Sequence, residues 1–180
     1  MKVGEAIADA MAAESNGPIF GLMGDANMAV WGPLCKDERV RMVSVRHDAA
    51  AVLMADGYAR ATGRLGVATV TSGPGLANCA NALLTAARAE TSLVLFTGEY
   101  EPEGKGVTQA LNQRKFSSAC EALFRSLRKV DNLAEDIREC FYIARTRKCP
   151  VILNLPAEHW EAEYPWEWNY QPSAKIVPLL

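Results

Sequence analysis

Short apolar segments alternate with amphipathic segments along most of this chain, and this alternation limits the possible folds more than any other feature. Apolar runs bounded by glycine, proline or polar residues are typical of buried strands, and apolar residues three and four positions apart are typical of helices that face a core. Strands that alternate with helices form parallel sheets. We therefore predict an α/β fold, a three-layer sandwich with a mostly parallel central sheet flanked by helices.

The expected elements follow directly from these patterns. The strands are predicted at 18–23, 41–45, 65–71, 92–97 and 151–155. The helices are predicted at 2–15, from near 27 onward, and at 48–61, 75–89, 120–128 and 132–147. Residues 99–107 are rich in glutamate, glycine and proline and predict an exposed loop.

The chain is long enough for one domain with a substantial core, since it has 180 residues of which 49% are hydrophobic. We assign residues 1–160 to this domain and 161–180 to a linker or docking tail. The tail has no periodicity and contains Trp166 and Trp168. Because exposed tryptophans are costly, we expect the tail to fold back over the domain or to pack on a partner.

The charge pattern argues against several classes of partner. The 19 basic and 21 acidic residues give a formal net charge of -2 and are spread along the chain, so neither nucleic acid nor a membrane surface is expected to bind. No apolar run approaches the roughly 20 residues that span a bilayer, and no secretory signal is recognised. We expect a cytoplasmic location, where the five cysteines would stay reduced.

Glycine-containing turns fall where three of the predicted strands end, at Gly21–Gly24, Ser72–Gly75 and Thr97–Gly98. Ligands of open parallel sheets bind at this edge, although glycines also serve simply to turn the chain. No G-x-G-x-x-G motif follows the first strand, which disfavours a nicotinamide-binding domain. Metal-ligand spacing is also absent, so no metal site is predicted on this chain.

An acidic residue begins the predicted helix 48–61, within Arg46-His47-Asp48. A carboxylate at this position either caps backbone N–H groups or takes part in chemistry. His47 has the same two interpretations, as a hydrogen-bonding residue at the helix start or as a site residue. Farther along, Asp56 and Arg60 are four positions apart, which predicts a structural ion pair on the helix surface.

Five motifs follow one another in a fixed order over residues 1 to about 160. They are Phe20-Gly21-x-x-Gly24, Arg46-His47-Asp48, Ala55-Asp56-Gly57-Tyr58-Ala59-Arg60, Thr71-Ser72-Gly73-Pro74-Gly75-x-x-Asn78 and Pro150-Val151-x-x-x-Leu155-Pro156. Together they resemble the pyrimidine-binding domain of thiamine diphosphate-dependent enzymes, in the group of acetolactate synthase, benzoylformate decarboxylase and pyruvate oxidase. The resemblance implies the thiamine diphosphate-binding fold.

The resemblance also implies a shared cofactor site. In this family one domain grips the aminopyrimidine ring, and a second domain with a Gly-Asp-Gly motif binds Mg²⁺ and the diphosphate. No Gly-Asp-Gly occurs in this chain, so Mg²⁺ is expected only on the second domain. The chain alone is therefore expected to bind the cofactor poorly and to catalyse nothing.

At the catalytic position the resemblance implies a glutamate that hydrogen-bonds N1′ of the pyrimidine, whereas this chain has Asp48. Aspartate is one methylene shorter, on the order of 1.5 Å, and a misplacement near 1 Å can cost about a hundredfold in rate. Two interpretations stay open: Asp48 performs the same role through a shifted helix or a bridging water, or it marks a weak, altered or lost activation step. By the same resemblance, Gln113 and His47 are candidate substrate contacts. The expected cofactor-binding residues are Gly24, Asp48, Ser72, Gly73, Pro74, Gly75 and Asn78.

These motifs predict a half-site domain of an acetolactate synthase-like enzyme that acts on a small 2-oxo acid. The expected partners are a diphosphate-binding domain or subunit and a second copy of the chain, giving at least a dimer. Two alternatives stay open: the chain is the short subunit of a split 2-oxo acid decarboxylase, or it is a non-catalytic binding or assembly module that kept the fold after losing the glutamate.

Overall fold

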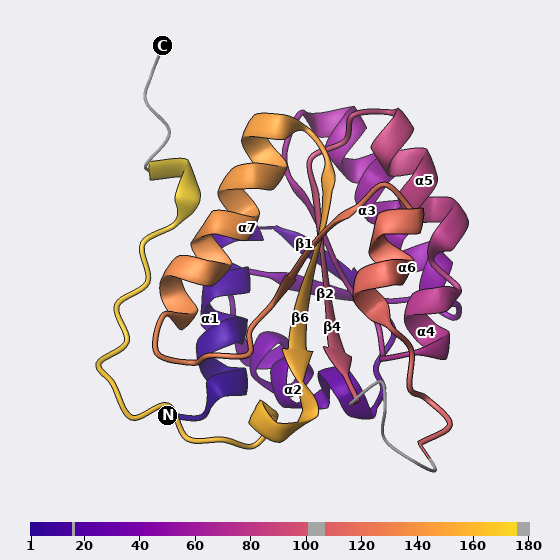
Figure 1. Cartoon of the computed structure of the whole chain (residues 1–180). Helices are drawn as coiled ribbons and strands as arrows, with labels where there is room; N and C mark the ends of the chain where they lie inside the picture. Colours follow the sequence, from indigo (N-terminus) through magenta and orange to yellow (C-terminus); the bar gives the residue numbers. More distant parts are fainter. Residues whose placement is uncertain (16, 101–106, 176–180) are drawn as a thin grey trace.

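The computed structural model describes residues 1–15, 17–100 and 107–175, and these residues contain one six-stranded sheet. The strand order is β2-β1-β3-β4-β6-β5, and every neighbouring pair is parallel (Figure 1). The strands are β1 (Pro18–Gly21), β2 (Arg41–Ser44), β3 (Gly66–Thr69), β4 (Leu93–Glu99), β5 (Leu123–Ser126) and β6 (Pro150–Pro156). The predicted parallel α/β fold is confirmed.

Helices cover both faces of the sheet, which makes the three layers seen in Figure 1. One face is covered by α1 (Val3–Ser15), α2 (Met28–Lys36) and α7 (Leu133–Arg147). The other is covered by α3 (Asp48–Thr62), α4 (Pro74–Ala77), α5 (Ala80–Arg88) and α6 (Gln113–Ala119). Three short 3-10 helices complete the described chain: η1 (Asp25–Asn27), η2 (Ala157–His159) and η3 (Ser173–Lys175).

The central strands are buried on both sides because helices cover both faces. Along β4, Val94 and Phe96 point into the core beneath α1 and α7, while Leu93 and Leu95 point into the core beneath α3 and α5. All four side chains have 0% exposure. This explains why the central strands appear in the sequence as continuous apolar runs rather than as alternating patterns.

The predicted helix at 120–128 is wrong. Its middle forms strand β5, and the helix of this region, α6, lies earlier, at Gln113–Ala119. The edge strand β5 is only partly buried, so it lacks the apolar run that identifies a central strand. The predicted helix 75–89 is divided into α4 and α5. Of the predicted exposed loop 99–107, Glu99 is instead the buried last residue of β4, and residues 101–106 lie outside the described residues.

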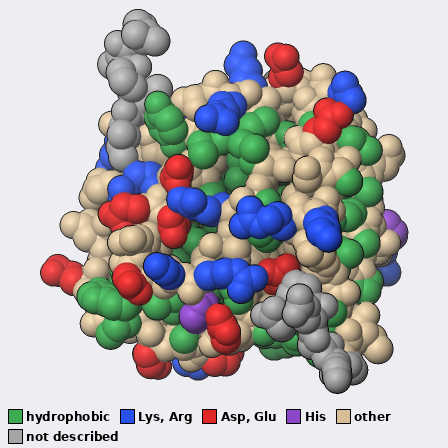
Figure 2. Space-filling view, in the orientation of Figure 1, with side chains coloured by type: hydrophobic (Ala, Val, Ile, Leu, Met, Phe, Trp, Pro, Cys, Tyr) green, Lys and Arg blue, Asp and Glu red, His purple; other side chains and the backbone are tan. Residues whose placement is uncertain are grey.

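The surface mixes charges of both signs. On the face viewed in Figure 2, Lys and Arg side chains lie among Asp and Glu side chains. Arg125, for example, contacts both Asp136 and Glu139 of α7. In the part of the chain that the structure describes, no helix is both long and apolar enough to cross a membrane.

The described part of the tail folds back over α1 and α7 (Figure 1). Glu163 forms an isolated antiparallel bridge with Lys2, and the Trp168 indole packs edge-on against the Tyr164 ring at 5.4 Å between centroids. Trp166 is 47% exposed. Of the two expectations for the tail, folding back over the domain is confirmed for residues 161–175.

The buried carboxylate of Glu14, at the end of α1, holds this tail in place. It accepts hydrogen bonds from the Tyr170 hydroxyl at 2.7 Å, from Ser173 N at 2.6 Å and from Ser173 Oγ at 2.8 Å. The Arg145 guanidinium of α7 lies 3.2 Å away. Burial and the neighbouring Glu14 charge raise the pKa of Tyr170, so the phenol stays a donor at neutral pH.

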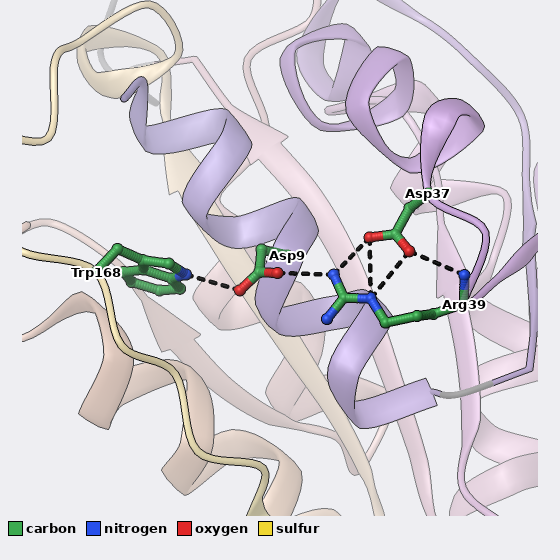
Figure 3. Close-up of polar contacts among 4 residues, drawn as sticks. All are labelled: Asp9, Asp37, Arg39 and Trp168. Atoms are coloured by element: carbon green, nitrogen blue, oxygen red, sulfur yellow. Dashed lines mark hydrogen bonds and ion pairs between the residues drawn. The ribbon is translucent and has the colours of Figure 1, made fainter.

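A second polar cluster joins α1, the turn after α2 and the tail (Figure 3). The Arg39 guanidinium lies between Asp37 and Asp9, 2.7 Å from an Asp9 oxygen. The other Asp9 oxygen accepts a hydrogen bond of 2.7 Å from Trp168 Nε1. The hydrogen bonds from Arg39 lower the pKa of Asp37 and raise that of Arg39.

This cluster predicts an acid-dependent loss of stability. The pKa of Asp37 is lower in the folded chain than in the unfolded chain, where it is near 3.9. The contribution of Asp37 to folding stability is therefore complete above the unfolded-state pKa and is lost as pH falls through the folded-state pKa. The pair is partly exposed, so the contribution should not exceed about 1 kcal/mol. Urea unfolding of wild type and Asp37→Asn should differ at neutral pH and converge in acid. A difference that is independent of pH would contradict this assignment.

Candidate cofactor-binding site

The predicted site lies at the carboxyl ends of the strands, where β1 and β3 are neighbours. The chain leaves β1 toward one side of the sheet and β3 toward the other, and such a switch point is where open α/β sheets bind ligands. The loops after these two strands touch: a Cβ added at Gly24 would lie 2.6 Å from the Thr71 side chain. Only glycine allows this approach.

Asn27 fixes the first of these loops. Its side-chain oxygen accepts a hydrogen bond from Gly24 N at 2.8 Å, and its amide donates to Leu22 O at 3.1 Å and to Thr69 Oγ1 at 2.9 Å. The side chain is buried and joins the loop to β3. Asn27 was not among the predicted site residues, although an asparagine just after a Gly-Asp turn is a recognisable helix-start signal.

Asp48 is buried at the start of α3, and its two oxygens have different environments. Oδ2 accepts a hydrogen bond of 3.1 Å from Asn78 Nδ2. Oδ1 is the one buried side-chain oxygen or nitrogen, among residues 1–15, 17–100 and 107–175, that has no hydrogen-bond partner. Leaving a buried acceptor unsatisfied costs about 1–3 kcal/mol, and more if it is charged. A ligand that donates to Oδ1 would remove this cost.

The cap of α3 comes from His47 rather than from Asp48. His47 Nδ1 accepts a hydrogen bond from Ala49 N at 3.2 Å, and His47 is exposed. The role of His47 at the helix start is confirmed, and its contact with substrate stays a prediction. Because His47 caps the helix, the Asp48 carboxylate is not needed for that purpose.

Gly75 lies directly against the Asp48 carboxylate. A Cβ at Gly75 would lie 2.9 Å from Asp48 Oδ1 and 2.6 Å from Thr71 Cγ2. The glycine therefore lets the start of α4 approach the carboxylate. The structure thus brings together three of the predicted cofactor-binding residues: Asp48, Gly75 and Asn78.

The loop that precedes α4 is held in one conformation. Gly73 has φ +52, and a Cβ there would lie 1.9 Å from the Gln109 carbonyl oxygen. Ser72 Oγ donates to Gln109 Oε1 at 3.3 Å, and Pro74 begins the helix, where its missing N–H is not needed. Ser72, Gly73 and Pro74 are thereby fixed in the turn that leads to Gly75, the loop residue that lies against Asp48.

Gln113 occupies a different environment from the other predicted residues. Its side chain is buried, donates to Gly98 O at 2.8 Å and accepts from Asn154 Nδ2 at 2.9 Å. These bonds attach α6 to β4 and β6. The structure assigns Gln113 this structural contact, and its role in binding substrate stays a prediction.

The predicted ion pair between Asp56 and Arg60 is confirmed, with 2.6 Å between the charged groups. Contrary to the expectation of a surface pair, the Asp56 side chain is 1% exposed and also accepts a hydrogen bond of 2.6 Å from Thr91 Oγ1. Asp56 therefore connects α3 to the segment before β4. Both of its oxygens are satisfied, unlike those of Asp48 on the same helix.

The all-parallel sheet, the glycine loops at its switch point and the unpartnered carboxylate oxygen define an α/β ligand-binding domain. Residues 1–119 match the family model described as the N-terminal TPP binding domain of thiamine pyrophosphate enzymes. The chain belongs to this family. The family assignment made from the ordered motifs is thereby confirmed.

Individual relatives support the same assignment. The acetolactate synthase large subunit of Haemophilus influenzae is 30% identical over 155 residues, which cover 84% of this chain and 27% of that protein. Sulfoacetaldehyde acetyltransferase of Castellaniella defragrans is 31% identical over 89% of this chain and 27% of its own length. 2-hydroxyacyl-CoA lyase 2 of Danio rerio is 31% identical over 86% of this chain and 25% of its own length. The chain therefore spans about a quarter of each relative.

Proposed function

We propose that this domain binds the aminopyrimidine ring of thiamine diphosphate and supplies half of the active site of an acetolactate synthase-like enzyme acting on a small 2-oxo acid. The observation that carries the proposal is Asp48 Oδ1, a buried acceptor without a partner at the switch point of the sheet. A ring that offers a hydrogen bond there would satisfy it. The match to the thiamine pyrophosphate enzyme family supports this choice of ring.

The residues around Asp48 fit such a ring. Asp48 Oδ1 is the atom that would share a proton with a pyrimidine nitrogen, and Gly75 presents backbone without a side chain beside it. Bound thiamine diphosphate supplies an electron sink for the decarboxylation of 2-oxo acids. This chain would orient the ring, exclude water from the shared proton and hold the carboxylate in place.

The unpartnered oxygen favours a retained function for Asp48 over a degenerate one. A carboxylate with a purely structural role is expected to be satisfied, as Asp56 is on the same helix. Asp48 instead combines burial with a free acceptor, an arrangement that natural proteins keep at sites where a ligand completes it. We propose that Asp48 performs the role that relatives give to glutamate.

A partner domain or subunit is part of this proposal. The chain spans about a quarter of its relatives, and diphosphate and Mg²⁺ would be bound by the partner. Leu53 and Met54, one turn or more beyond Asp48 on α3, are 45% and 42% exposed. Apolar side chains exposed beside a half-site support an interface there, and we propose at least a dimer.

Titration of the chain with thiamine diphosphate, followed by amide NMR, tests the proposal. We expect weak, saturable shifts at millimolar cofactor, centred on Asp48, Gly75 and Asn78, unchanged when Mg²⁺ is omitted and absent in Asp48→Ala. Complete absence of shifts in the wild-type chain would overturn the pyrimidine site. Tight binding that requires Mg²⁺ would overturn the division between two domains.

Asp48→Ala is also expected to stabilise the free chain, by about 1 kcal/mol, because it removes a buried acceptor that has no partner. Asp56→Ala is the matched control on the same helix. It removes a buried, fully bonded carboxylate and should destabilise the chain by about 2 kcal/mol. Thermal unfolding of the two variants checks whether Asp48→Ala raises the stability and Asp56→Ala lowers it. Equal destabilisation by both would mean that Asp48 is structural.

A further inference from the structure

Asn78 lies where the predicted helix 75–89 is interrupted. It follows the last residue of α4, its backbone N–H donates to Pro74 O at 3.0 Å, and α5 begins only at Ala80. The interruption leaves Asn78 on the exposed side of the domain, and its side-chain amide reaches inward to Asp48 Oδ2 at 3.1 Å. An exposed residue therefore contributes one hydrogen bond to a buried carboxylate.

We infer that Asn78 is a positioning residue: its amide fixes the Asp48 carboxylate so that Oδ1, and not Oδ2, is the oxygen that meets the ligand. The inference rests on the proposed function of Asp48. It assigns Asn78 an indirect role through Asp48, instead of the direct cofactor contact predicted from the motif.

The two oxygens of an aspartate are chemically equivalent, and the terminal torsion of the side chain is broad, so the backbone alone does not select one of them. Two features make the selection here. The Asn78 amide holds Oδ2, and the absence of a side chain at Gly75 leaves space beside Oδ1, where a Cβ would lie 2.9 Å away. Because aspartate has fewer torsions than glutamate, one neutral donor is enough to define the plane of the carboxylate.

A neutral donor also suits a carboxylate that must share a proton. A cationic partner would form a strong ion pair with Asp48 and compete with the ligand for the negative charge. The amide orients the group through a hydrogen bond of ordinary strength. Asn78→Asp would keep the shape of the side chain and lose the donor at neutral pH.

The test is a titration with the free aminopyrimidine moiety of thiamine, followed by amide NMR, for wild type, Asn78→Ala, Asn78→Asp and Asn81→Ala. Asn78→Ala should weaken binding about three- to tenfold, the equivalent of one hydrogen bond. Asn78→Asp should weaken it more at neutral pH, and relative to wild type it should recover in mild acid, where two adjacent carboxyls share a proton. Asn81 is exposed one turn away on α5, and its replacement should leave affinity unchanged.

The recovery in acid is the readout that a merely structural role would not produce. Unchanged affinity in Asn78→Ala, with binding still abolished in Asp48→Ala, would overturn the inference and leave the proposed function intact. Failure of the wild-type chain to bind the aminopyrimidine would overturn both. Thermal unfolding of each variant verifies that the chain is folded during the titration.

Discussion

Replacing Glu14 by alanine is expected to lower the free energy of unfolding by about 3 kcal/mol, because breaking a buried charged network by removing one partner typically costs 3–5 kcal/mol. The Glu14 side chain has 0% exposure and accepts hydrogen bonds from Tyr170, Ser173 and Arg145. The lower end of the range applies because Arg145 is 25% exposed and can recover some hydration. The tail should lose its anchor at the same time.

Denaturant unfolding and the fluorescence of the tail tryptophans check this result. Glu14→Gln should be intermediate, since it keeps the shape and loses the charge opposite Arg145. Glu38→Ala, which removes an exposed carboxylate, is the control and should change stability by less than about 0.5 kcal/mol. If Glu14→Ala unfolded like the control, the carboxylate would not hold the tail in solution.

Gly73→Ala is expected to destabilise the chain by about 3 kcal/mol and to abolish binding of the aminopyrimidine. The backbone of Gly73, with φ +52 and ψ -108, lies in a region that costs a non-glycine residue about 1–3 kcal/mol. In addition, the new Cβ would lie 1.9 Å from the Gln109 carbonyl oxygen, so one of the two backbones must move. Movement of Gly73 would displace Gly75, which lies against Asp48.

Gly57→Ala provides the control for this substitution. Gly57 lies within α3, and a Cβ there would meet nothing within 4 Å. Alanine should therefore stabilise the helix, by about 0.5–1 kcal/mol. Thermal unfolding and the aminopyrimidine titration of both variants give the comparison. If Gly73→Ala bound the aminopyrimidine with the affinity of the wild-type chain, the loop before α4 would not shape the site.

The fold was predictable from the sequence where burial is complete. The segments that became β1, β3, β4 and β6 are continuous apolar runs because helices cover them on both faces, and such runs are readable without any structure. The helix predicted at 120–128 was wrong because β5 is an edge strand with partly exposed residues, and the spacing of its apolar residues resembles that of a helix. Tertiary pairing with β6 decides its conformation, and sequence periodicity does not report such pairing.

For the site, the sequence could predict which residues lie close together but not the hydrogen bonds between them. The ordered motifs place Asp48, Gly75 and Asn78 together, and the structure bears out that juxtaposition. No sequence pattern could state which oxygen of Asp48 is satisfied, because this depends on where α4 ends and how the Asn78 amide turns inward. The contribution of Asn27 was missed for a similar reason, since two of its partners are backbone groups and one lies on β3.

The tail has a kinetic consequence, because it joins segments that are remote along the chain. Glu14 and Ser173 are 159 residues apart, as are Asp9 and Trp168. Closing such long loops before the sheet has formed is entropically unfavourable, so these contacts are expected to form after the rate-limiting step of folding. Substitutions that release the tail should then accelerate unfolding and leave the folding rate nearly unchanged. The tail would thus govern how long a folded molecule persists rather than how quickly it forms.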